Sequence, residues 1–76
     1  MEIDQFLSCF IALFEDTDPS QIFPEKKFRE LEEWSSMMGL SVIAMADEEY
    51  HIRLTGEDIR KSVTIGDIFE LIRSRK

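Results

Sequence analysis

Apolar residues near the start of the chain recur with the period of an α-helix. They stand at i, i+3, i+4, i+7, i+8 and i+11, separated mainly by polar residues: Ile3, Phe6, Leu7, Phe10, Ile11 and Phe14. A single apolar stripe of this kind predicts an amphipathic first helix that buries one face. We expect this helix to end near residues 16–20, where Asp, Thr, Pro and Ser favour turns.

A long connection follows, from residue 16 to residue 35. Connections of this length in compact domains usually have some structure of their own. Apolar residues spaced along it can attach it to the core: Ile22, Phe23, Phe28, Leu31 and Trp34. We predict one or two helical turns within 25–31. Because long anchored loops often carry function, and this one leads to two serines, we expect it to be functional.

Ser35 and Ser36 open a second apolar run. Ser35 is a good N-cap, so we predict a helix from Ser36 to about Tyr50. The side expected to face the core carries Leu40, Ile43, Ala46 or Asp47, and Tyr50, with Val42 and Ala44 beside it. The opposite side is expected to present Met38, Ser41, Met45 and Glu48 or Glu49. Exposed methionine among polar residues suits an adaptable contact surface. The alternative is that Met37, Met38 and Met45 extend the core, and of these we favour burial for Met37.

Two capping patterns predict the remaining helices. Residues 51–55 alternate like a strand but have no partner strand, so we expect an extended linker with Leu54 pointing inward. Thr55 and Asp58 form a capping-box pattern that opens a short third helix at 56–61. The pattern recurs at Thr64 and Asp67 and opens a fourth helix. Each box has the apolar pair of a hydrophobic staple, Leu54 with Ile59 and Val63 with Ile68, and the fourth helix has an inner stripe of Ile65, Ile68, Phe69 and Ile72.

These elements predict an all-α fold. It is a small four-helix bundle in one domain, residues 1–76, with three main helices, one short third helix and a long first loop. A chain of 76 residues can bury only one small core and has no room for a closed catalytic cleft. Its apolar runs are far shorter than the roughly 18 residues of a membrane span. Glu2 and Asp4 stand where a signal peptide would carry cations, and the single Cys9 agrees with a reducing compartment, so we expect a cytoplasmic protein.

The net charge of −7 is unevenly distributed. Through residue 52 there are 12 acidic and 3 basic residues, giving −9, whereas the remainder has 4 acidic and 6 basic residues, giving +2. This excess of acid argues against nucleic acid as a partner, since nucleic-acid binding depends on cationic contacts to phosphate. A protein partner that approaches the serines should carry a basic surface.

The usual metal and catalytic patterns are incomplete. Residues 16–21 begin like a calcium-binding loop, but Gln21 stands where glycine is needed and Lys27 where the bidentate glutamate is needed. His51 is the only histidine, so neither a His-based metal site nor a Ser-His pair can be built. We therefore expect no metal site and no catalytic residue, and we interpret the protein as a non-enzyme.

A serine at the start of a helix has one chemical property of interest. The free backbone N–H groups and the positive end of the helix dipole favour an anion there. A phosphodiester on Ser36 would be stabilised in this position, while its far end would remain free. Both serines can also be plain N-caps, and their position alone leaves that interpretation open.

Three segments together form a more specific pattern. They are residues 28–37, Phe-Arg-Glu-Leu-Glu-Glu-Trp-Ser-Ser-Met, residues 40–45, Leu-Ser-Val-Ile-Ala-Met, and residues 47–50, Asp-Glu-Glu-Tyr. This pattern resembles the acyl carrier protein family, whose signature is Asp-Ser-Leu at the start of the second helix. In that family a Phe precedes the serine by eight residues, and an apolar helix ends in acids and an aromatic residue. The resemblance covers nearly the whole chain, including Leu54 and the Val-Thr-Ile of residues 63–65.

The resemblance implies an acyl-carrier-like fold and a specific modification. Family members carry 4′-phosphopantetheine, derived from coenzyme A and added by a phosphopantetheinyl transferase, on the signature serine, and they bear acyl groups as thioesters between enzymes of fatty acid or polyketide biosynthesis. The matching residue here is Ser36; Ser35 replaces the usual Asp, is expected to cap, and is the second choice for attachment. Acyl-transferring or acyl-ligating enzymes with basic docking surfaces are the implied partners of a monomer. The expected partner surface consists of Glu33, Met37, Met38, Ser41, Met45 and Glu48.

Departures from the family pattern point to a specialised carrier. Met37 replaces the usual Leu, and Met38, Gly39 and Ser41 replace a segment that is commonly more acidic. Two alternatives stay open. One is an aminoacyl, peptidyl or D-alanyl carrier of the same fold, and the other is an unmodified acidic helical adaptor that binds a partner through its methionine face. A DNA-binding helical domain is disfavoured by the acidic first part of the chain.

Overall fold

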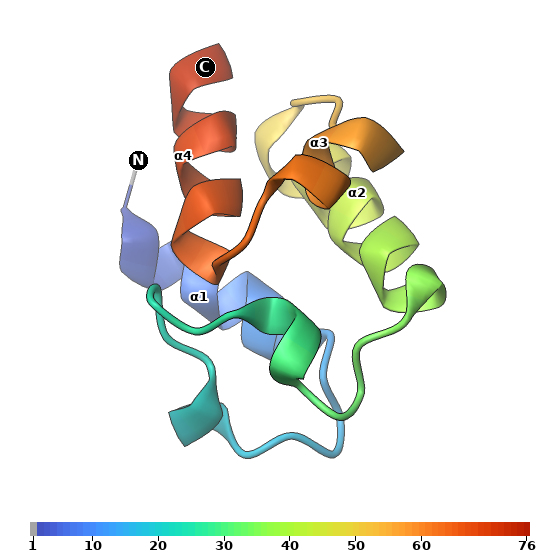
Figure 1. Ribbon diagram of the computed structural model, residues 1–76. Coiled ribbons are helices and arrows are strands. Elements are labelled where there is room, and N and C mark those ends of the chain that lie inside the picture. The colour runs from blue at the N-terminus through green and yellow to red at the C-terminus, as the bar shows by residue number, and fades with distance from the viewer. Residues whose placement is uncertain (1) are drawn as a thin grey trace.

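The computed structural model describes residues 2–76, and within this range the chain folds into four α-helices and two short 3₁₀ turns (Figure 1). The helices are α1 (Ile3–Ala12), α2 (Ser36–Tyr50), α3 (Gly56–Lys61) and α4 (Ile65–Arg75), and the 3₁₀ turns are η1 (Pro19–Gln21) and η2 (Phe28–Glu30). The prediction of an all-α fold with three main helices and one short helix is confirmed. None of the helices between residues 2 and 76 combines the length and the apolar character required to cross a bilayer.

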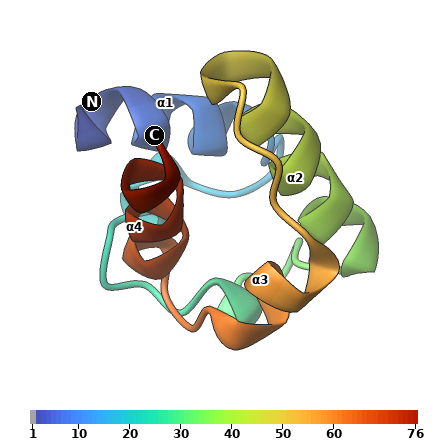
Figure 2. The ribbon, with the colours of Figure 1, turned by 90° about the horizontal axis from the view of Figure 1, so that it is seen from above.

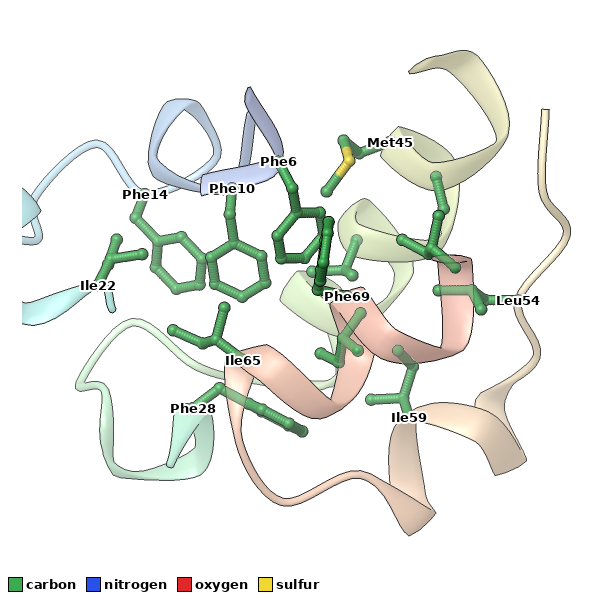
Figure 3. Close-up of a cluster of buried hydrophobic side chains, with 14 of the residues drawn as sticks. Phe6, Phe10, Phe14, Ile22, Phe28, Met45, Leu54, Ile59, Ile65 and Phe69 are labelled. Carbon is green, nitrogen blue, oxygen red and sulfur yellow. The ribbon is translucent and has the colours of Figure 1, made fainter. Parts of the chain in front are cut away.

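The helices surround a common interior when the molecule is viewed from above (Figure 2). Phe6, Phe10 and Phe14 form a row along one side of this interior (Figure 3). The ring centroids of Phe6 and Phe10 are 5.8 Å apart, and those of Phe10 and Phe14 are 5.1 Å apart. The ring centroid of Phe69, on α4, lies 5.4 Å from that of Phe6. Helix α1 ends at Ala12, earlier than we predicted. Phe14, the last residue of the predicted apolar stripe, lies beyond the helix but is still buried.

The long first loop is attached to the core and to the start of α4. Its apolar residues Ile22, Phe28 and Leu31 are buried as predicted, whereas Phe23 is 41% exposed, so its expected role as an anchor is wrong. The loop backbone pairs with the first turn of α4, where the N–H groups of residues 65 and 66 donate to carbonyls of residues 26 and 24 at 3.0 and 2.8 Å. These bonds satisfy loop groups that would otherwise have to reach water. The turn η2 falls inside the predicted segment; η1 was not anticipated.

Helix α2 begins and ends at the predicted residues, but it is rotated relative to our prediction. Val42, Met45, Ala46 and Tyr50 are buried with Gly39, while Leu40 is 61% exposed. Four expectations are therefore wrong: Leu40 and Ala44 do not face the core, Met45 is not on the outer side, and Met37, at 74% exposure, is not buried. The cause is visible in the sequence, because almost every residue of 37–46 is apolar or small. Such a run has little periodic contrast, and tertiary packing decides which side is buried.

Both predicted capping boxes are formed. Thr55 N–H donates to Asp58 Oδ2 at 2.9 Å, and Asp58 N–H returns a bond to Thr55 Oγ1 at 3.1 Å. At the start of α4 the same two bonds join Thr64 and Asp67, at 3.0 and 3.1 Å. The inner stripe of α4 is buried as predicted, as are Leu54 and its staple partner: Leu54, Ile59, Ile65, Ile68, Phe69 and Ile72. Val63, at 48% exposure, does not make a buried staple.

Candidate functional site

The two serines at the start of α2 have different structural roles. Ser35 is in extended conformation, with φ −158° and ψ 174°, and its Oγ accepts a hydrogen bond from Met38 N–H at 3.3 Å. Its own carbonyl accepts from Gly39 N–H at 3.0 Å, which starts the helical ladder. Ser36 is the first helical residue and its side chain is exposed. Ser35 is therefore the cap, as predicted, and the hydroxyl of Ser36 is not required for capping.

A cleft of about 490 Å³ adjoins Ser36. It lies between the last part of the long loop, the first half of α2 and helix α3, and it is lined by Arg29, Trp34, Ser35, Ser36, Gly39, Leu40, Ile43, Gly56, Ile59 and Arg60. Most of its surface is apolar, and its volume falls within the range of small-molecule sites. The cleft therefore places an exposed hydroxyl at the edge of a space that suits an apolar group.

Arg29 holds one wall of the cleft in position. Its guanidinium donates to the carbonyls of Ser62 at 2.6 Å and of Ile59 and Arg60 at 3.0 Å each. These carbonyls end α3, where the helix dipole favours a cation. The guanidinium carbon also lies 4.7 Å from the ring centroid of Phe28. Through these contacts the loop is joined to α3 across the cleft.

Trp34 forms the loop side of the cleft. Its ring lies 4.5 Å from that of Phe28, in a tilted arrangement, and its side chain is half-buried. Sequence reasoning assigned Trp34 only to anchoring the loop and Ile59 to a hydrophobic staple of the core, and it did not assign Gly39 or Arg60 to any site. A glycine within an apolar helical run was a usable signal, since it has a cost in helix stability that calls for a reason.

The expected partner residues fall into two groups. On the outer side of α2 lies a stripe that we call the α2 outer stripe, and all of its residues except Ser41 are exposed: Met37, Leu40, Ser41, Ala44 and Glu48. Ser41 is half-buried there and donates to the Met37 carbonyl at 3.3 Å. Met45 is excluded from any such surface because it is 5% exposed, and Met38 is half-buried against the core. Met37, Leu40 and Ala44 are the residues of this surface that the sequence led us to place in the core.

Glu33, also expected to contact partners, has an internal role. It is half-buried, and its Oε1 accepts from the N–H of Asp16 at 2.9 Å and from the hydroxyl of Thr17. These bonds join the beginning of the long loop to its end. Glu33 thus helps to hold the segment that leads to Ser35 and Ser36.

Outside the cleft, the structure describes one thiol, that of Cys9. Burial, with a smaller effect from the negative charge of Glu49, raises the pKa of the Cys9 thiol, which disfavours the nucleophilic thiolate. Across residues 2–76, no three His, Cys, Asp or Glu side chains are grouped so that they could hold a metal ion. A second cavity, of about 500 Å³, lies at the ends of α2 and α4 and the start of α1, and it is lined by Gln5, Glu49, Tyr50, Arg73 and Lys76.

Comparison of the sequence with models of protein families and with curated proteins found no match. A functional interpretation therefore depends on the residues and geometry described above, together with the sequence pattern around Ser36.

Proposed function

We propose that this protein is an acyl carrier protein that bears 4′-phosphopantetheine on Ser36. The observation that carries the proposal is the division of the two serines at the start of α2. Ser35 is used as the cap, whereas Ser36 is exposed and stands at the edge of an apolar cleft. A residue that only capped the helix would not need a second serine beside it. The acyl-carrier-like fold is part of the same proposal, and the order and lengths of the four helices support it.

The surroundings of Ser36 fit a phosphodiester. The hydroxyl lies in the first turn of α2, where the helix dipole favours negative charge. The charged residues that line the adjacent cleft are Arg29 and Arg60, although the chain as a whole has a net charge of −7. The bound group would supply a terminal thiol that holds cargo as a thioester. The protein itself would contribute attachment, a favourable electrostatic setting and an apolar space beside the attachment point.

The α2 outer stripe suits the partners of such a carrier. Met37 and Leu40 are exposed apolar residues next to the attachment serine, and Asp47 and Glu48 add exposed acid farther along the helix. A basic enzyme surface with an apolar centre would complement this arrangement. The proposed partners are the phosphopantetheinyl transferase and enzymes that transfer or ligate acyl groups. Carriers of aminoacyl groups would use the same residues and differ in the partner enzyme.

The most direct test is enzymatic loading. The protein is incubated with coenzyme A and a broad-specificity phosphopantetheinyl transferase, and the product is measured by intact mass spectrometry. We expect one addition to the native chain and none to Ser36→Ala. Ser35→Ala is the matched control, since it should lower stability by about 1 kcal/mol through loss of the cap and still be loaded. No addition with several transferases, or an addition that persists in Ser36→Ala, would contradict the proposal.

The exposure of Met37 and Leu40, 74% and 61%, also favours a second candidate, an unmodified adaptor that binds a partner through the α2 outer stripe. The two candidates differ in their need for the serine hydroxyl. For an adaptor, Ser36→Ala would leave partner binding intact, whereas a charge at residue 40 would abolish it. For a carrier, Ser36→Ala would abolish loading.

A further inference from the structure

Tyr50, the last residue of α2, has a buried hydroxyl that the fold leaves without a partner. The residue is 5% exposed, and its Oη makes no hydrogen bond with residues 2–76. Burial, with smaller effects from Cys9 and Glu49, raises the pKa of Tyr50, so the phenol is protonated at neutral pH and can donate a hydrogen bond. Phenylalanine would fill the same space without an unpaired polar group. A buried polar group that lowers stability in this way is typical of a binding site.

Tyr50 lines the second cavity, of about 500 Å³, which we call the α2–α4 cavity. The other lining residues come from the start of α1 and the ends of α2 and α4: Gln5, Glu49, Arg73 and Lys76. The cleft beside Ser36 has different lining residues and adjoins the opposite end of α2, roughly 20 Å away along the helix axis. The α2–α4 cavity is therefore a separate site.

The α2–α4 cavity presents mainly hydrogen-bond donors. Arg73 bonds to the exposed Glu70 through Nε and Nη2, and these bonds leave its Nη1 group for another acceptor. Lys76 donates to the Tyr50 carbonyl at 3.2 Å, which holds its ammonium group at the end of α2 and uses one of its three N–H bonds. Together with the phenol of Tyr50, these groups suit an acceptor that carries a negative charge.

The single acid in the lining narrows the class of ligand. Two cations, Arg73 and Lys76, and one acid, Glu49, give the lining a net charge of +1, which matches a monoanion such as a carboxylate. A phosphate group carries more negative charge near neutral pH, so Glu49 would repel it more strongly. Glu49 and the amide oxygen of Gln5 can accept hydrogen bonds. The lining therefore fits a small carboxylate that also carries a hydrogen-bond donor.

We propose that the α2–α4 cavity binds a small carboxylic acid of the α-hydroxy or α-amino class. Its carboxylate lies between Arg73 and Lys76 and accepts a hydrogen bond from Tyr50, and its hydroxyl or ammonium group donates to Glu49. The bound acid joins the start of α1 to the ends of α2 and α4. This inference goes beyond the proposed function and does not rest on it, because the cleft beside Ser36 takes no part in it.

Titration followed by NMR tests the inference directly. The ¹⁵N-labelled protein is titrated with sodium L-lactate and with L-alanine at constant ionic strength, and the amide chemical shifts are measured. We expect saturable shifts at the residues that line the α2–α4 cavity, with a Kd on the order of 1–10 mM for at least one of the two acids. The acid that binds more tightly identifies the donor as hydroxyl or ammonium. Acetate, which lacks the donor, and inorganic phosphate should bind at least about fivefold more weakly.

Variants of the lining residues locate the site. Tyr50→Phe and Arg73→Gln should each weaken binding about tenfold, and the acid should raise the melting temperature of the native protein more than that of Tyr50→Phe. Arg53→Gln, at an exposed arginine outside the cavity, is the matched control and should bind like the native protein, as should Ser36→Ala. Unchanged affinity in Tyr50→Phe, as a hydroxyl bonded only to buried water would give, would overturn the inference. Equal binding of acetate, or no saturable shift with either acid, would do the same, whereas failure of enzymatic loading would contradict only the proposed function.

Discussion

Asp58 and Asp67 are a matched pair of residues, and comparing them measures how much the contact between Asp58 of α3 and Arg75 of α4 contributes to stability. Each occupies the third position of a helix and accepts a hydrogen bond from the backbone N–H of its N-cap threonine. They differ in one respect. Arg75 donates two hydrogen bonds to Asp58, at 2.7 and 2.8 Å, whereas Asp67 accepts a second backbone bond from Val63 at 3.0 Å. Asp58 therefore bonds both to its own helix start and to the end of α4, whereas Asp67 bonds only to its own helix start. Replacing each aspartate by alanine compares the stability that these two arrangements contribute.

The expected losses follow from these contacts. Loss of a cap and of a negative charge near the positive end of the helix dipole costs about 1 kcal/mol, which is the value we expect for Asp67→Ala. The Asp58 side chain is only 15% exposed, and its removal also ends the two-bond pairing with Arg75. We therefore expect about 2 kcal/mol for Asp58→Ala. For a domain of this size these values correspond to falls in melting temperature of roughly 4–8 °C and 8–16 °C.

Urea unfolding followed by circular dichroism measures both losses, and Trp34 fluorescence provides a second probe. The two alanine variants are repeated in an Arg75→Gln background, where the excess loss at Asp58 should disappear. The excess should also shrink at high salt, because the pairing with Arg75 is only partly buried. Equal losses at the two aspartates would refute the reasoning, as would an excess that survives Arg75→Gln.

The same two carboxylates make the stability depend on pH. The hydrogen bonds from the Arg75 guanidinium and then from Thr55 N–H hold the pKa of Asp58 well below its ordinary value, and those from the N–H groups of Thr64 and Val63 lower the pKa of Asp67. The folded state then binds these protons more weakly than the unfolded chain, in which the pKa is about 3.9. The contribution is complete above that pKa and is lost as the pH falls through it toward the lower folded values. In Asp58→Ala, the free energy of unfolding should decrease less between pH 5 and pH 2 than it does in the native protein, as measured by unfolding curves at each pH.

Two further substitutions test local features. Tyr50 is 5% exposed and its hydroxyl has no hydrogen-bond partner among residues 2–76, so Tyr50→Phe should raise the free energy of unfolding by about 1 kcal/mol; a loss would mean that the hydroxyl is bonded. His51 follows the last residue of α2 and has φ 58°, in the left-handed region that glycine adopts without strain. His51→Gly should therefore raise the free energy of unfolding by about 0.5–1 kcal/mol, whereas His51→Ala should not raise it. Chemical denaturation measures both, and an equal gain for glycine and alanine would show that the backbone conformation is not the cause.

The first residues of α2, α3 and α4 could be predicted from the sequence because they are decided locally. The caps at Ser35, Thr55 and Thr64 each bond to a group three residues away, so all of the necessary information lies within one turn. The orientation of α2 could not be predicted in this way. Its burial pattern depends on what the rest of the chain packs against, and the run from Met37 to Ala46 contains too few polar residues to choose a side.

The candidate site shows the same division between local and tertiary information. The exposure of Ser36 and the capping role of Ser35 follow from their order at the start of a helix. The cleft does not, because its walls come from segments far apart in the sequence. Arg29 donates to the carbonyls of residues 59, 60 and 62, which are 30 to 33 positions later in the sequence, and no periodicity or motif predicts this contact.

Hydrogen bonds join the segments that surround the cleft. Arg29 joins the loop to the end of α3, Glu33 joins the two ends of the loop, and Asp58 joins α3 to the end of α4. Glycine is a poor helix former, so Gly39 lowers the stability of the helix that lines one side of the cleft. If stability alone had shaped this region, alanine at residue 39 would fill part of the space at no steric cost. Helix preference therefore does not explain the glycine, whereas the three attachments explain how the segments around the cleft beside Ser36 are held together.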